Sequence, residues 1–378
     1  MKQHMMYIFT LLLSIGLLVA GNRLASTQAH DSGNVQEAIY YTATIVEIVE
    51  RSERDLGWGS TSIDIDFTAR ITTRGSSRGQ IITARQQIGD FVLVNEREVS
   101  PGDRVVLFHA VWGDSYYFVN YVRMNYIAIL GIVFVALVLL LGRKKGFNSL
   151  VALGLTCFGV FWVFIPAILS GRNIYIATLI ICSYVILTTL LIVIGSNKKT
   201  YSAMIGCFAG VLVAGGLMLA MDMVLRLTGA LDTETEALLL LPTAQPINLR
   251  AIIFAGVIIG AVGAIMDVAM SIASSLWELK EAGGVTDFKS IATSGVNIGK
   301  DILGTMLNTL ILAYIGSSLS VILLLNANSQ SLVALFTREM IIVEFLRALV
   351  GSFGMLLTIP ITACICGWLY QKKAQNRP

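Results

Sequence analysis

Charged residues are scarce in this sequence of 378 residues. Only 13% of the chain is charged and 55% is hydrophobic, whereas about a quarter of a soluble domain is charged. Several apolar runs reach the ~20 residues that a transmembrane helix needs. The composition therefore excludes an ordinary soluble protein and predicts a polytopic α-helical membrane protein. The net charge of +3, without interleaved basic and aromatic residues, gives no support to nucleic-acid binding.

Cysteine and histidine are also few. All five cysteines fall in apolar runs, so a disulfide framework is not expected. The three histidines lie far apart in the sequence and lack the spacing of metal ligands. The sequence shows no nucleophile–base set and no phosphate-binding loop. We therefore expect no enzymatic activity, no metal and no cofactor.

The N-terminal segment 1–21 begins with charged residues and continues as an apolar run. It is either a cleaved signal peptide or a retained anchor helix. The residues before Gly21 do not form a clean A-x-A cleavage site, which favours the anchor. Polar and small residues over 22–39 indicate a linker. Both interpretations predict that the segment that follows is exported.

The segment 40–123 changes to a period of two. Apolar residues alternate with polar ones over 63–72, which is typical of a half-buried strand. Similar short runs are YTATIVEIVE, GQIITARQQI, FVLVNERE, DRVVLFHA and YYFVNYV, separated by glycine-containing turns. Five or six short strands predict a small extracytoplasmic β-barrel, OB-like in type. It is either a structural or partner-docking domain, or a ligand-binding one.

The segment 125–370 is expected to form the transmembrane core. Seven apolar spans are predicted at 125–141, 149–169, 174–195, 203–226, 251–272, 303–325 and 340–368. Clusters of lysine and arginine follow alternate spans, and the positive-inside rule places them in the cytoplasm. The barrel is then outside the cytoplasmic membrane of a bacterial cell and the tail 371–378 is inside. The outer connection 228–249 is long enough for a short surface helix, and 282–300 predicts a cytoplasmic amphipathic elbow.

One predicted span, within 252–281, carries an acidic residue. Asp267 lies at helical spacing with Ser271, Ser274 and Glu278, which places all four on one face. A charged side chain in hydrocarbon costs at least ~2.5–3.5 kcal/mol, so we interpret Asp267 as a proton- or cation-binding group. The alternative is that it lies near the cytoplasmic end and reaches water or a backbone donor. Glycines at small-residue spacing, which allow another helix to approach closely, are Gly256, Gly260 and Gly263.

The next span predicts a second polar stripe. It begins at Asp301 and continues through Gly304 or Thr305 to Asn308, with Tyr314 as a further candidate. Asp301 alternatively serves only to favour the helix N-terminus. Because the two spans run antiparallel, we expect Asn308 to face Asp267 and Ser271. Gly304 adds a further close-packing position. Two acid–base pairs at helical spacing, which are either structural or functional, are Asp222 with Arg226 and Glu344 with Arg347.

Two long motifs carry a family resemblance: GAIMDVAMSIASSLWELKE, followed by SGVNIGKDILGTMLNTLILAYIG. They resemble the YibE/F family of multi-pass membrane proteins, and the barrel resembles the YibE-like arm of that family. The resemblance implies a putative permease, with a YibF-like membrane partner or a homo-oligomer in the lipid bilayer. A weaker likeness to SecD, SecF and the resistance-nodulation-division transporters rests on Gly263, Asp267 and Glu278, in a G-x-x-x-D…E pattern. It implies a proton-relay role for Asp267 by analogy alone.

These observations predict a transporter or translocation subunit whose substrate is unknown. Its coupling would depend on Asp267, with Ser271, Asp301 and Asn308 in support. The alternative is a membrane scaffold or assembly factor whose outer β domain recruits a partner.

Overall fold

The chain forms two compact units, one of Ser32–Leu137 and one of Met1–Asp31 with Val138–Pro378. The computed structural model describes residues 2–26, 39–57, 60–73, 77–89, 97–109, 115–241, 246–283, 287–320, 322–323 and 338–371. The predictions for most of the linker, for the strand FVLVNERE, for the end of the span 303–325 and for most of the C-terminal tail lie outside these residues.

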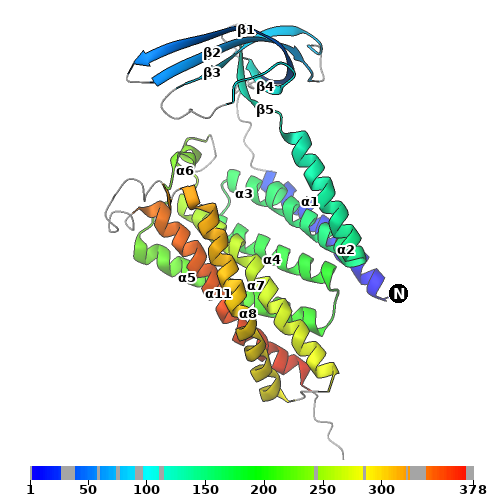
Figure 1. Ribbon diagram of the computed structural model, residues 1–378. Coiled ribbons are helices and arrows are strands. Elements are labelled where there is room, and N and C mark those ends of the chain that lie inside the picture. The colour runs from blue at the N-terminus through cyan, green and yellow to red at the C-terminus, as the bar shows by residue number, and fades with distance from the viewer. Residues whose placement is uncertain are drawn as a thin grey trace, which may run out of the picture. The chain divides into compact units, whose positions relative to one another are not determined.

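The first unit contains the predicted β-barrel (Figure 1). Its strands are β1 (Ile39–Gly57), β2 (Ser60–Ile71), β3 (Ile81–Ile88), β4 (Arg104–His109) and β5 (Tyr116–Tyr121). They close in the order β1-β2-β3-β5-β4. Alternate residues of each strand point inward, as the period-two pattern predicts, and form a core around Ile65, Phe67 and Leu107.

One strand of the barrel is much longer than its neighbours. β1 pairs with β2 from Ala43 to Gly57, but with β4 only from Ile39 to Thr44. Beyond that point all ten residues from Val46 to Asp55 are exposed. The far half of β1 is therefore an edge strand within the part of the chain that the structure describes.

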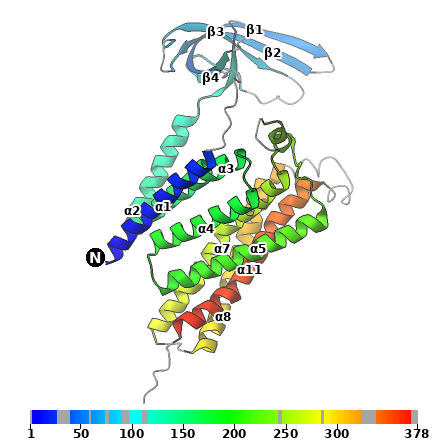
Figure 2. The same ribbon diagram turned by 180° about the vertical axis from the view of Figure 1, so that it is seen from behind.

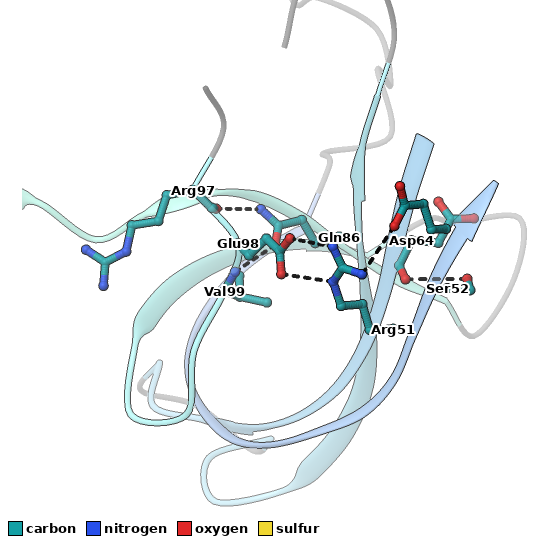
Figure 3. Close-up of polar contacts among 8 residues, drawn as sticks. Arg51, Ser52, Asp64, Gln86, Arg97, Glu98 and Val99 are labelled. Atoms are coloured by element: carbon teal, nitrogen blue, oxygen red, sulfur yellow. Dashed lines mark hydrogen bonds and ion pairs between the residues drawn. The ribbon is translucent and has the colours of Figure 1, made fainter. Parts of the chain in front are cut away.

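A buried glutamine fastens one loop of the barrel (Figure 3). The Gln86 side chain is 1% exposed. Its Nε2 donates to the carbonyl of Arg97 at 3.2 Å, and its Oε1 accepts from the amide of Val99 at 2.9 Å. The Tyr121 hydroxyl donates to the same Arg97 carbonyl at 2.7 Å. A polar side chain is thus tolerated in the barrel because it satisfies two backbone groups.

The helix that follows the barrel begins almost at once. β5 ends at Tyr121, and α2 (Met124–Phe158) starts at Met124. Even the intervening Val122 is held, since its amide donates to the Arg104 carbonyl at 2.8 Å. The barrel and the first turns of α2 are therefore joined without a flexible linker.

The helix α2 reverses direction inside its length. Arg143 has φ 47° and ψ −125°, far from helical values. A Cβ on Gly146 would meet the carbonyl carbon of Val138 at 3.1 Å, although eight residues of straight helix span about 12 Å. The predicted spans 125–141 and 149–169 are therefore the two arms of a helical hairpin. Its second arm continues through the π-helical turn η1 (Gly159–Phe164) and α3 (Ile165–Leu169).

The second unit is a helical bundle (Figure 2). Its remaining helices are α1 (Lys2–Ser26), α4 (Ile174–Val193), α5 (Lys198–Leu225), α7 (Leu249–Glu281), α8 (Phe288–Ser317) and α11 (Glu339–Tyr370). In the described part of the chain, seven helical stretches are long and apolar enough to cross a membrane, one of them the hairpin Met124–Leu169. α5, α7 and α11 pack against one another at the centre, and α8 lies mainly on α11.

Close packing in the bundle depends on glycines of α5 and α8. Gly206 and Gly210 of α5 lie directly against the Thr362 and Thr358 side chains of α11. On α8, a Cβ at Gly295 would approach the Cβ of Ala363 to 2.7 Å. Both helices carry the G-x-x-x-G spacing that brings membrane helices together.

Two connections differ in their agreement with the predictions. The outer connection contains α6 (Thr233–Ala237) and the 3-10 turn η2 (Leu238–Leu240), as expected of a short helix. Of the expected elbow 282–300, residues 288–300 form the first turns of α8, which continues unbroken into the predicted span. The Asp287 side chain accepts from the Ser290 amide at 2.9 Å and begins the helix there.

Candidate functional site

The candidate site lies on α7, whose two sides differ sharply. One side is a continuous apolar face that packs against α5 and α11, with Val257, Ile265 and Ile272 fully buried. The opposite side presents an exposed stripe through Gly256, Gly260, Gly263 and Asp267. The predicted glycine and carboxylate positions therefore share one face, and that face is not the one that builds the core.

Asp267 lies far from either end of its helix. At 1.5 Å per residue, it is about 27 Å from Leu249 and about 21 Å from Glu281, the first and last residues of α7. Its carboxylate is exposed and has no hydrogen bond or ion pair among the described residues. One turn before it, a Cβ on Gly263 would meet no atom within 4 Å. Asp267 thus has no backbone donor among the described residues, and the alternative that it reaches water stays a prediction.

The rest of the α7 stripe leads toward the end of the helix. Ser271 and Ser274 are half-buried and Glu278 is exposed. Next to them, the Trp277 Nε1 donates to the Glu281 carboxylate at 2.8 Å, and its ring meets that of Tyr370 at 5.1 Å. The four residues predicted to share a face do so, because a continuous helix connects them.

The helix α8 brings the second polar stripe to the level of Asp267. A Cβ on Gly260 would lie 3.1 Å from the Tyr314 hydroxyl, and one on Gly295 would lie 2.8 Å from the Leu276 side chain. These contacts fix α7 and α8 as antiparallel and place Asp267 level with the turn Thr305–Asn308. Exposed positions of α8 include Asp301, Gly304, Thr305 and Asn308. No hydrogen bond joins Asn308 to Asp267 in the described residues, and their mutual facing stays a prediction.

Of the four predicted packing glycines, only Gly260 lies close to another helix, at the Tyr314 hydroxyl of α8. Gly263 and Gly304 have no atom within 4 Å of a built Cβ among the described residues, and Gly256 has only an Arg347 Nη2 at 3.9 Å. Within the chain, close helix approach uses Gly206, Gly210 and Gly295 instead. Gly206 and Gly210 have the same G-x-x-x-G spacing as Gly256 and Gly260, so spacing alone does not identify the packing face.

The ion pair Glu344–Arg347 borders the other end of the glycine stripe. Arg347 Nη1 lies 2.5 Å from Glu344 Oε1, and both side chains are half-buried. Glu344 Oε2 and Arg347 Nε are buried without a hydrogen-bond partner in the described residues. The pairing predicted from helical spacing is therefore formed, and it retains unused hydrogen-bonding capacity beside Gly256. Tyr314, the last residue of the second predicted polar stripe, lies between this pair and Asp267.

The second predicted pair, Asp222 with Arg226, does not form an ion pair. Arg226 adopts a left-handed conformation with φ 52° at the end of α5, so it leaves the helical spacing on which the prediction depended. One Asp222 carboxylate oxygen is buried without a partner in the part of the chain that the structure describes.

The geometry assembles polar groups along α7 and α8 but no metal centre in the described residues. No group of three or more histidine, cysteine or acidic side chains there is arranged to hold an ion. The arrangement offers instead the unpartnered carboxylate of Asp267, hydroxyls at helical spacing and open space beside Gly263.

Comparison with known proteins gives one finding. No curated protein and no solved structure matches this chain. A family model described as YibE/F-like protein matches residues 130–372, which include every helix of the bundle from the hairpin to α11. The chain therefore belongs to the YibE/F-like family.

Proposed function

We propose that the protein is a subunit of a membrane transporter or translocation system, and that Asp267 is its ionisable switch. The observation that carries the proposal is an unpartnered carboxylate in the middle of a long apolar helix. Contact with lipid would cost at least ~2.5–3.5 kcal/mol. Such a group is retained where it meets water, a mobile ion or a partner's polar group.

The neighbours of Asp267 suit an ion or proton route. Gly263 leaves space beside the carboxylate, and Ser271, Thr305 and Asn308 supply hydroxyl and amide groups at nearby depths. Toward the other end, the Tyr314 hydroxyl and the Glu344–Arg347 pair extend the polar positions along the same stripe. Asp301 adds a further carboxylate to these positions in the middle of α8.

We also propose that a membrane partner covers this stripe. In the most apolar stretch of α8 only 6% of the residues are buried, and in that of the hairpin Met124–Leu169 none are. In the corresponding stretches of α7 and α11, 56% of the residues are buried. A YibF-like chain or a second copy lying on α8 would enclose Asp267 and Asn308 together. The barrel, OB-like in this proposal, then lies outside the cytoplasmic membrane and the C-terminus inside.

The test compares Asp267→Asn with Glu278→Gln, a matched change of an exposed carboxylate on the same stripe. We expect a hydrophobic carbodiimide, which attacks protonated carboxyls in membranes, to label the wild-type chain and Glu278→Gln but not Asp267→Asn. We expect the Asp267→Asn chain, expressed at normal levels, to fail to complement a deletion strain. Normal complementation by Asp267→Asn would refute the switch.

The scaffold alternative is favoured by one observation, the exposed edge of β1 in the barrel. A scaffold predicts that Asp267→Asn keeps full activity and that deletion of residues 40–120, with the N-terminal helix retained, abolishes it. The two variants together distinguish the proposals.

A further inference from the structure

The far half of β1 is a sheet edge that the described barrel leaves open. β4 pairs with β1 only as far as Thr44, while β2 continues on the other side to Gly57. All ten residues from Val46 to Asp55 are exposed, including Val46 at 43% and Val49 at 59%. An open edge presents unpaired backbone groups and is a template for another strand.

The regular part of this edge is short and well defined. β-bulges interrupt the pairing with β2 between Ile48 and Glu50 and between Asp55 and Gly57. From Glu50 to Asp55 each residue pairs with one residue of β2 in turn. A partner strand can therefore add in register along these six residues.

The charged residues along this stretch would lie opposite residues of the opposite charge on a second copy of the same strand. Two antiparallel strands related by a two-fold axis through Ser52 place Glu50 opposite Arg54 and Arg51 opposite Glu53. Because the axis repeats each pair, all four cross-strand charge pairs are of opposite sign. Opposite charges across a strand pair stabilise it, and like charges destabilise it.

The same sequence disfavours the neighbouring registers. A symmetric antiparallel pair places the residue on the axis opposite its own copy. Moving the axis by one residue places Arg51 against Arg51 or Glu53 against Glu53, and moving it by two does the same to Glu50 or Arg54. Ser52 is the uncharged residue in the run Glu50–Arg54, so it defines the register without a like-charge pair.

Of the four charged side chains, those of Glu50 and Arg54 are available for the contact. Arg51 already binds Glu98 through two hydrogen bonds of 3.2 and 3.0 Å (Figure 3). Glu50 and Arg54 are exposed and form no hydrogen bond or ion pair with the described residues. The Glu50–Arg54 pairs would therefore decide the register.

We propose that the β1 edge of one chain pairs antiparallel with the β1 edge of a second copy of this chain, with the two-fold axis at Ser52. The contact extends the sheet of each barrel across the dimer. It does not depend on the transport role of Asp267, since it uses the barrel alone.

The test is a cysteine cross-link in the full-length chain in its own membrane. Opposed residues of antiparallel strands have Cα atoms about 4.5–5.5 Å apart, within the range that a disulfide spans. We expect Ser52→Cys to form a disulfide-linked dimer under mild oxidation. The controls are the unmodified chain, whose five cysteines lie in the helices, and Thr83→Cys on the exposed side of β3.

A charge exchange in the Ser52→Cys background tests the register. Arg54→Glu places two acids opposite each other twice and is expected to lower the cross-linked fraction about fivefold. Adding Glu50→Arg restores opposite charges and should restore the cross-link. The proposal is overturned if Ser52→Cys cross-links no more than Thr83→Cys, if it joins a different protein, or if the charge exchange fails to recover the dimer.

Discussion

Replacing Gln86 with leucine tests whether one buried side chain holds the barrel loop in place. Leucine keeps the volume of the side chain but removes both hydrogen bonds, to the Arg97 carbonyl and the Val99 amide. The Arg97 carbonyl keeps the Tyr121 hydroxyl at 2.7 Å. The Val99 amide loses its acceptor at a residue that is 2% exposed. An unsatisfied buried donor costs about 1–3 kcal/mol.

The expected magnitude follows for hydrogen exchange of the full-length chain. Amides of β1, β2 and β3 that exchange by opening of the barrel should exchange about 5–150-fold faster in Gln86→Leu, since 1.4 kcal/mol corresponds to a factor of ten. The neighbouring Gln87 is exposed on the same strand, so Gln87→Leu is a matched control and should leave these rates nearly unchanged. Equal effects of the two substitutions would refute the reasoning, because only Gln86 reaches the loop.

Three further predictions follow from other contacts. Gly210→Ala should lower the thermal stability of the bundle in detergent by about 1–3 kcal/mol, because its Cβ would collide with the side chains of Thr358 and Ile265. Gly216→Ala on the same helix has open space and should be neutral, and Thr358→Ala should rescue Gly210→Ala in part, since the Ile265 Cγ2 contact at 2.9 Å remains. Tyr370→Phe should cost about 0.5–1.5 kcal/mol in the same measurement, because it removes the hydrogen bond to the Ala273 carbonyl at 3.1 Å but keeps the ring; a loss as large as that of Tyr370→Ala would contradict this. The hydrogen bond from Arg85 lowers the pKa of Asp66 below its usual value. Their ion pair therefore stabilises the barrel fully at pH values above the unfolded-state pKa of about 3.9. This stabilisation is lost as the pH falls through the lower pKa that Asp66 has in the folded barrel. Asp66→Asn should therefore destabilise the barrel by about 0.2–1 kcal/mol at pH 7 and by less at pH 2, as urea titration of hydrogen exchange would show.

The sequence allowed the fold class to be predicted because hydropathy and period are local properties. The alternation over residues 63–72 predicted β2, and the apolar run around Asp267 predicted α7. The reversal at Arg143 was also implicit, since the basic cluster there separates two spans. The continuous start of α8 was missed because residues 288–300 are amphipathic, which suits an interfacial helix and the first turns of a packed one equally.

The candidate site was predicted less completely, since facing depends on how helices pack. Helical spacing placed Asp267, Ser271 and Glu278 on one face, and the structure has them there. The spacing of Asp222 and Arg226 predicted an ion pair that does not form. Arg226 is left-handed at the end of α5, and sequence periodicity does not reveal this. Helical spacing also placed Tyr314 on the second polar stripe, but its approach to Gly260 could not be predicted because it depends on how α8 packs on α7.

The two-residue junction between β5 and α2 has a mechanical consequence. Val122 and Arg123, fully extended, reach only about 7 Å, and the amide of Val122 is already tied to Arg104. A torque applied to the barrel, for instance by a second chain paired with the β1 edge, would be transmitted to the first turns of α2, because no flexible linker lies between them. Motion of the barrel would then be transmitted along the helical arm that ends at Arg143.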